Sequence, residues 1–98
     1  MIRHLALFTV IDEKQAEKDA LIAEAAVRLA PLVGQVPGLR SIAVHTDELG
    51  EGNYDFTIIA DLDDLDAVKV YATHPAHVEA ASFIGTFRGQ RAVVDYEI

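Results

Sequence analysis

The chain has 98 residues, of which 51% are hydrophobic and 24% are charged. This length and composition predict a single folded domain over residues 1–98 and exclude a disordered chain. Sixteen acidic residues against eight basic ones give a net charge of −8, so we expect no binding to nucleic acids or to membranes. The sequence has no cysteine, which excludes disulfides, iron–sulfur clusters and a thiol nucleophile and fits a cytoplasmic protein.

The first predicted element is a strand over residues 2–11, which are rich in β-branched and aromatic side chains. Both alternating faces of this strand are largely apolar. One face carries Ile2, His4, Ala6, Phe8 and Val10, and the other carries Arg3, Leu5, Leu7, Thr9 and Ile11. In a small α+β domain the helices cover only one face of the sheet. The second apolar face therefore predicts that another chain packs against it.

A long amphipathic helix is predicted over residues 12–33. We expect Asp12 to cap its start and Gly34 to cap its end. The apolar positions that recur at helical spacing are Leu21, Ala25, Leu29 and Leu32.

The middle of the chain predicts two strands joined by a loop. A turn over residues 36–39, in which Gly38 can take a positive φ, leads into a strand over 39–46. A glycine-containing loop over 47–53 then connects to a strand over 54–61.

The last part of the chain predicts a broken helix and a final strand. Asp63 or Asp64 is expected to cap the helix. His74 and Pro75 interrupt it, because the residue before proline avoids the α region and proline suits the first turn of a new helix. With a strand over 90–97, the order is βαββαβ. This order predicts a ferredoxin-like α+β fold with a four-stranded antiparallel sheet and helices on one face.

Four segments of the sequence carry a resemblance to a known family. They are residues 1–8 (MIRHLALF), 36–39 (VPGL), 71–77 (YATHPAH) and 94–96 (VDY). Together they resemble the stress-responsive A/B barrel (Dabb) family, and the likeness extends over essentially the whole chain. The resemblance implies a dimeric α/β barrel, in which two sheets pack face to face, their inner faces enclose the barrel and the helices cover the outer faces.

The resemblance also implies candidate catalytic residues. Plant members of the family include a polyketide cyclase that closes a linear poly-β-ketone by aldol condensation. Its tyrosine and histidine match Tyr71 and His77, and His4 matches another residue of its pocket. Histidine, with an ordinary pKa of about 6.5, suits removal of a proton beside a carbonyl. A neutral tyrosine can donate to the enolate. We expect the dipole of the helix that starts at Pro75 to keep His77 neutral.

Two functional hypotheses follow. In the first, a homodimer binds a small hydrophobic or carbonyl-bearing metabolite in a barrel pocket. It would act as a cyclase, isomerase or lyase without a cofactor, with His77 as general base and Tyr71 as hydrogen-bond donor. The other expected pocket residues are His4, Phe8, Ile42, Phe56, Phe83 and Phe87. In the second, the protein is a non-enzymatic stress-associated dimer with a filled barrel, in which Tyr71 and His77 serve packing.

Other chemistry fits the sequence less well. His74 is expected to fix the helix break by bonding local backbone, and His4 is also compatible with a satisfied core position. His74 and His77 have a spacing that can bind a metal ion, but Pro75 places them on different segments, so we expect no metal site. The acidic residues Asp61, Asp63, Asp64 and Asp66 suit a solvated helix start. Haem-degrading relatives typically rely on a tryptophan, which this chain lacks, and there is no Gly-x-Gly-x-x-Gly motif for a nucleotide.

Overall fold

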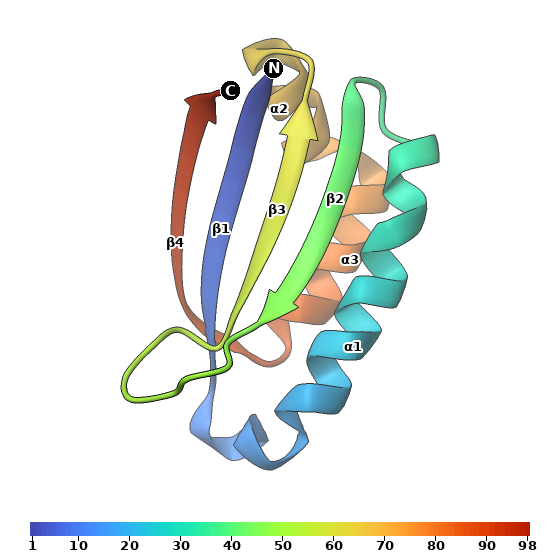
Figure 1. Ribbon diagram of the computed structural model, residues 1–98. Coiled ribbons are helices and arrows are strands. Elements are labelled where there is room, and N and C mark those ends of the chain that lie inside the picture. Colours follow the sequence, from blue (N-terminus) through green and yellow to red (C-terminus); the bar gives the residue numbers. More distant parts are fainter.

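A four-stranded antiparallel sheet forms one layer of the molecule in a computed structural model that describes residues 1–98 (Figure 1). Its strands are β1 (Ile2–Val10), β2 (Leu39–Thr46), β3 (Phe56–Leu62) and β4 (Arg88–Glu97). They lie in the order β2-β3-β1-β4. This order confirms the ferredoxin-like fold predicted from the sequence.

The helices form a second layer on one face of the sheet (Figure 1). They are η1 (Asp12–Glu17), α1 (Lys18–Leu29), η2 (Ala30–Gly34), α2 (Leu65–Thr73) and α3 (Pro75–Gly85), where η marks a 3₁₀ helix. In Figure 1 they lie behind β1, β3 and β2, whereas β4 stands clear of them at one edge. Every residue of β4 except Gly89 is accordingly exposed. None of the helices combines the length and the apolar character needed to cross a membrane.

The predicted first helix is in fact three pieces. Asp12 is the first residue of η1 and not its cap; Ile11 precedes η1 and makes no side-chain capping bond. At the other end, Pro31 has no N–H for the α-helical ladder, and the chain tightens into η2. Gly34 lies inside η2 and is not a C-cap. Both expected caps of this helix are therefore wrong.

The caps of the later helices agree with the sequence. Asp64 Oδ1 accepts a hydrogen bond from Ala67 N at 2.8 Å and begins α2. His74 Nδ1 accepts from Ala76 N at 3.1 Å, and Pro75 is the first residue of α3. The imidazole of His74 thus fixes the break between the two helices, as predicted.

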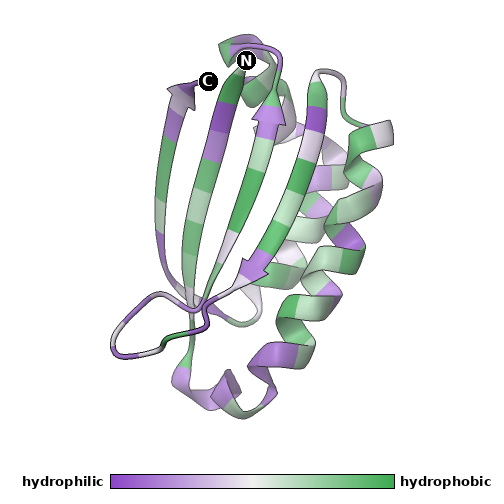
Figure 2. Cartoon of the chain, viewed as in Figure 1, coloured by the Kyte–Doolittle hydropathy of each residue, from purple (hydrophilic) through white to green (hydrophobic).

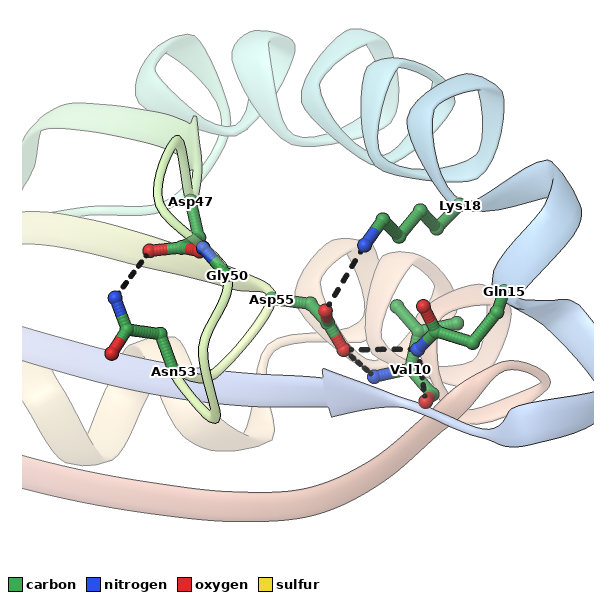
Figure 3. A network of polar contacts seen from close by, with 7 residues as sticks. All are labelled: Val10, Gln15, Lys18, Asp47, Gly50, Asn53 and Asp55. Carbon is green, nitrogen blue, oxygen red and sulfur yellow. Dashed lines mark hydrogen bonds and ion pairs between the residues drawn. The ribbon is translucent and has the colours of Figure 1, made fainter.

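The hydrophobic core lies between the two layers. Phe8 and Phe56 stack with ring centroids 4.9 Å apart, and Phe87 lies 6.0 Å from Phe56. Ile22 and Leu29 of α1 are buried in the same cluster. At one end of the core, Asp55 is held by Val10 N at 2.7 Å, Gln15 Nε2 at 3.2 Å and Lys18 Nζ at 3.4 Å (Figure 3). These bonds tie the start of β3 to the segment that leads into α1.

The opposite face of the sheet has no helix against it. Because Ala6 and Phe8 point to the helices, Leu5 and Leu7 point away from them. Leu5 pairs with Ile59 on one side and with Val94 on the other, so an apolar row crosses this face. The strands in Figure 2 are largely green in their middle parts, since apolar residues point to both faces. We call this uncovered surface the open face; it is the second apolar face predicted from β1.

Candidate active site

A cavity of about 270 Å³ lies between the sheet and the helices. Its lining residues come from β1, α1, β3, α2, α3 and β4 and are His4, Ala6, Phe8, Leu29, Ile58, Tyr71, His77, Ala81, Ile84, Gly85, Arg88 and Arg91. This volume is just below the ~300 Å³ at which ligand pockets usually begin, so the cavity suits a small ligand.

The helix break brings Tyr71 and His77 together. Tyr71 lies near the end of α2 and His77 near the start of α3, and their ring centroids are 4.1 Å apart. His77 Nδ1 lies 3.3 Å from the carbonyl oxygen of Ala72. Because a carbonyl only accepts, Nδ1 carries the proton and Nε2 keeps its lone pair. His77 is therefore arranged to accept a proton through Nε2.

The environment also keeps His77 neutral. Burial lowers the pKa of His77, the hydrogen bond to the carbonyl of Ala72 acts in the opposite direction, and the electrostatic influence of His4, Arg91 and His74 lowers it further. The expected neutral state thus agrees with the structure. The main cause is burial, with a smaller effect of the neighbouring Arg91.

Tyr71 is a neutral hydroxyl donor at the same cavity. Its side chain is 3% exposed, and burial raises the pKa of Tyr71 to about 12, against a smaller lowering by the charge of Arg91. Every fully buried side-chain polar atom of the protein has a hydrogen-bond partner. The Tyr71 hydroxyl bonds no protein group, so it is not fully buried. The hydroxyl is therefore open to the cavity and free to bond a ligand.

His4 is held in place by a carboxylate that sequence reasoning missed. Its Nδ1 lies 2.6 Å from Asp95 Oδ1, and its ring meets Tyr71 edge-on at 5.8 Å. Asp95 is directly opposite His4 in the pairing of β4 with β1. The carboxylate accepts from Nδ1, which leaves Nε2 of His4 as the nitrogen that can meet a ligand.

The structure brings four of the predicted site residues to the cavity: His4, Phe8, Tyr71 and His77. The other four expected wall residues do not line this cavity and lie in or against the core; they are Ile42, Phe56, Phe83 and Phe87. Phe83, for example, packs against Phe87 at 5.5 Å and under the guanidinium of Arg28 at 4.0 Å. Apolar character alone does not distinguish a cavity wall from filled core.

This cavity differs in position from the pocket expected inside the barrel, where the open faces of two sheets would meet. The strand residues that line the cavity, such as Ala6 and Ile58, belong to the helix-covered face. The cavity therefore lies on the side of the sheet that the helices cover.

No three or more histidine or carboxylate side chains are grouped so as to hold a metal ion. His74 uses Nδ1 to cap α3, and His4 uses Nδ1 on Asp95.

The fold and the cavity define a ferredoxin-like α+β barrel protein. Residues 2–98 match the stress responsive A/B barrel domain, and the chain belongs to this family (Dabb). An uncharacterized protein of Streptomyces coelicolor is 34% identical over 99 residues, which is 99% of each chain.

Solved structures similar to this chain share its fold. A dimeric ferredoxin-like protein of unknown function from Bacteroides fragilis is 30% identical, with a TM-score of 0.90 over 99% of this chain and 95% of that chain. A dimeric ferredoxin-like protein of unknown function from Thermobifida fusca is 33% identical, with a TM-score of 0.83 over 99% of this chain and 90% of that chain. The family predicted from the sequence is thereby confirmed.

Proposed function

We propose that the protein is a cytoplasmic homodimer that binds a small hydrophobic, carbonyl-bearing metabolite in the cavity and converts it as a cyclase, isomerase or lyase without a cofactor. The observation that carries this proposal is the meeting of Tyr71 and His77 at one cavity, with their rings 4.1 Å apart. One is a neutral donor with no protein partner, and the other is a neutral base with a free nitrogen.

The proposed chemistry begins with proton removal beside the carbonyl of the ligand. His77 Nε2 takes the proton, and the electron pair of the broken C–H bond moves toward the carbonyl oxygen to give an enolate. Tyr71 donates its hydroxyl hydrogen bond to that oxygen, where negative charge develops. In ring closure the enolate carbon attacks a second carbonyl of the same molecule, and the alkoxide that forms takes the proton from His77. In isomerisation His77 returns the proton to a different carbon of the delocalised anion.

The dimer part of the proposal is supported by the open face. Its apolar row through Leu5, Ile59 and Val94 has no cover within the chain, and Val94 is 52% exposed. Beside this row, Arg3 binds Asp61 through two bonds of 2.8 and 3.0 Å, which leaves no unpaired charge there. The similar structures from Bacteroides fragilis and Thermobifida fusca are dimeric.

A second candidate is the non-enzymatic dimer, in which the same residues serve packing. The contacts of Tyr71 with His77 at 4.1 Å and with His4 at 5.8 Å favour it, because such aromatic pairs stabilise a fold. Under this alternative, removal of either side chain lowers the free energy of unfolding and changes no rate.

Deuterium exchange tests the proposed chemistry without knowledge of the natural substrate. The protein is incubated in D₂O with cyclohexanone or phenylacetone, and proton NMR follows the loss of the signals beside the carbonyl. We expect exchange above the buffer rate, reduced about 100-fold by His77→Ala and by Tyr71→Phe. His45→Ala is the matched control, because His45 is exposed and outside the cavity. Equal exchange by wild type, H77A and Y71F, all folded, would contradict the catalytic roles.

A further inference from the structure

Two arginines of the protein have no carboxylate partner, and both line the cavity. The other three arginines form ion pairs, Arg3 with Asp61 at 2.8 Å, Arg28 with Glu24 at 3.1 Å and Arg40 with Asp63 at 2.6 Å. Arg88 bonds only the carbonyl of Gly89, at 3.3 Å, and Arg91 bonds no protein group. In a chain with sixteen acidic and eight basic residues, unpaired arginines are unexpected.

A β-bulge places both arginines on the cavity side of β4. Arg91 is opposite Phe8 and Arg88 is opposite Val10, with a register shift between the two pairs. Residues three apart on a regular strand point to opposite faces of the sheet. The extra residue of a β-bulge in β4 turns Arg88 to the same face as Arg91. Gly89 permits the bulge, because a Cβ there would lie 2.7 Å from Thr9 Oγ1, the atom that accepts from Gln90 N.

The cavity therefore presents two unpaired positive charges within an acidic protein. These are Arg88 and Arg91; no aspartate or glutamate lines the cavity, and Asp95 bonds the ring of His4 beside it. The arginine side chains are exposed and lie at its rim, whereas its apolar surface comes from residues such as Ala6 and Ile58. This distribution separates a charged end from an apolar end.

We propose that the ligand of this cavity is a small amphipathic carboxylic acid, whose carboxylate is bound by Arg88 and Arg91 and whose apolar part lies toward Ala6 and Ile58. Guanidinium groups bind carboxylates through paired, charge-assisted hydrogen bonds, which suits two unpaired arginines at one rim. The proposal rests on the proposed function only in taking this cavity as the ligand site. It narrows the ligand class from carbonyl compounds in general to those that also carry an acid group.

The bound acid also affects the base. The positive charge of Arg91 contributes to the lowered pKa of His77. A carboxylate on Arg91 offsets that charge, so the pKa of His77 rises when the acid binds. The bound acid thus makes His77 a stronger base.

Calorimetry with hexanoate and hexanamide tests the proposal, since the two probes differ in charge and little in size. We expect hexanoate to bind wild type about tenfold more tightly, equivalent to about 1.4 kcal/mol. The preference falls below about threefold in the R88Q/R91Q double variant. The matched control is K14Q/K69Q, which removes two charges from exposed lysines outside the cavity and retains the preference. NMR titration of His77 in wild type should show its pKa rise with hexanoate and stay unchanged with hexanamide.

Three results would overturn the proposal: equal affinity of the two probes, a preference for hexanoate that survives R88Q/R91Q, or no binding of hexanoate at millimolar concentration. If hexanamide binds and ketone exchange depends on His77, the carboxylate inference fails while the proposed function stands. If hexanoate binds through the arginines and exchange ignores His77 and Tyr71, the proposed function fails while the carboxylate site stands.

Discussion

At the scale of single residues, the site depends on two histidines whose protons are placed by different acceptors. Ala72 O accepts from Nδ1 of His77, and Asp95 accepts from Nδ1 of His4. In both rings Nε2 is the nitrogen left for a ligand. The two acceptors differ in charge, however: only His4 is paired with a carboxylate. These contacts suit the proposed roles of His77 as the base and of His4 as a ring held to orient the ligand.

The lowered pKa of His77 predicts a dependence of stability on pH. In the unfolded chain His77 titrates near its ordinary pKa of about 6.5, and in the folded chain it titrates lower. Between these two values the unfolded state binds more protons, so the free energy of unfolding decreases as the pH falls. Urea unfolding at pH 7.5 and 5.5 measures how far the free energy of unfolding decreases between these two pH values. We expect this decrease to be smaller for His77→Gln than for wild type. An identical decrease in both proteins would contradict the assignment.

The residues of the site were only partly predictable from the sequence. Tyr71, His77 and His4 came from a family resemblance, and the alternating face of β1 brought Phe8 with them. Asp95 and Arg91 were missed, because their positions depend on the register of β4 against β1. A sequence pattern of Arg-x-x-Arg on a strand predicts opposite faces, and only the bulge at Gly89 places both on one.

At the scale of elements, the break between α2 and α3 places Tyr71 beside His77, the proposed catalytic pair. The structure confirms this break where the sequence predicts it, because the local chemistry of His74 and Pro75 determines it. The first helix was less predictable, since the 3₁₀ turns at both of its ends have no comparable signal beyond Pro31.

The cap at His74 should be measurable as stability. His74→Ala removes the bond to Ala76 N and is expected to lower the free energy of unfolding by about 1 kcal/mol. His74→Asn is the control, because asparagine is a good N-cap and should retain most of that stability. Urea denaturation compares the three proteins. Equal losses in both variants would show that the imidazole stabilises the break in some other way.

The turn before β2 predicts a strong dependence on one glycine. Gly38 has a φ of 84°, and a Cβ at this position would lie 2.7 Å from Ala67 Cβ on α2. Gly38→Ala should therefore lower the free energy of unfolding by about 1–3 kcal/mol. Gly34→Ala is the control, since nothing lies within 4 Å of a Cβ there and its φ is not positive. A thermal melt in which both variants match would contradict this reasoning.

At the scale of the whole molecule, the cavity and the proposed dimer contact lie on opposite faces of the sheet. The helix-covered face contains the cavity. The open face is proposed to bind the second copy. From the sequence we treated the two as one feature, a pocket inside a shared barrel, because the pattern of β1 reveals two apolar faces without showing which of them encloses space.

This separation predicts that dimerization and ligand binding can be uncoupled. Leu7 is 36% exposed on the open face, and Leu7→Glu would bury an unpaired charge in the proposed dimer. We expect the dissociation constant to rise more than about 100-fold, as measured by sedimentation velocity at micromolar concentration. Val27→Glu is the control, because Val27 is 66% exposed on α1, away from the open face, and this variant should remain dimeric.

The L7E monomer provides the decisive comparison, because its cavity keeps every lining residue. It should retain ketone exchange and the preference for hexanoate over hexanamide, provided that circular dichroism shows it folded. Loss of both activities in a folded monomer would mean that the second copy holds β4, and with it Arg88 and Arg91, in place. A wild-type protein that sediments as a single subunit would instead overturn the proposed dimer and leave the cavity unaffected, because the cavity lies on the helix-covered face.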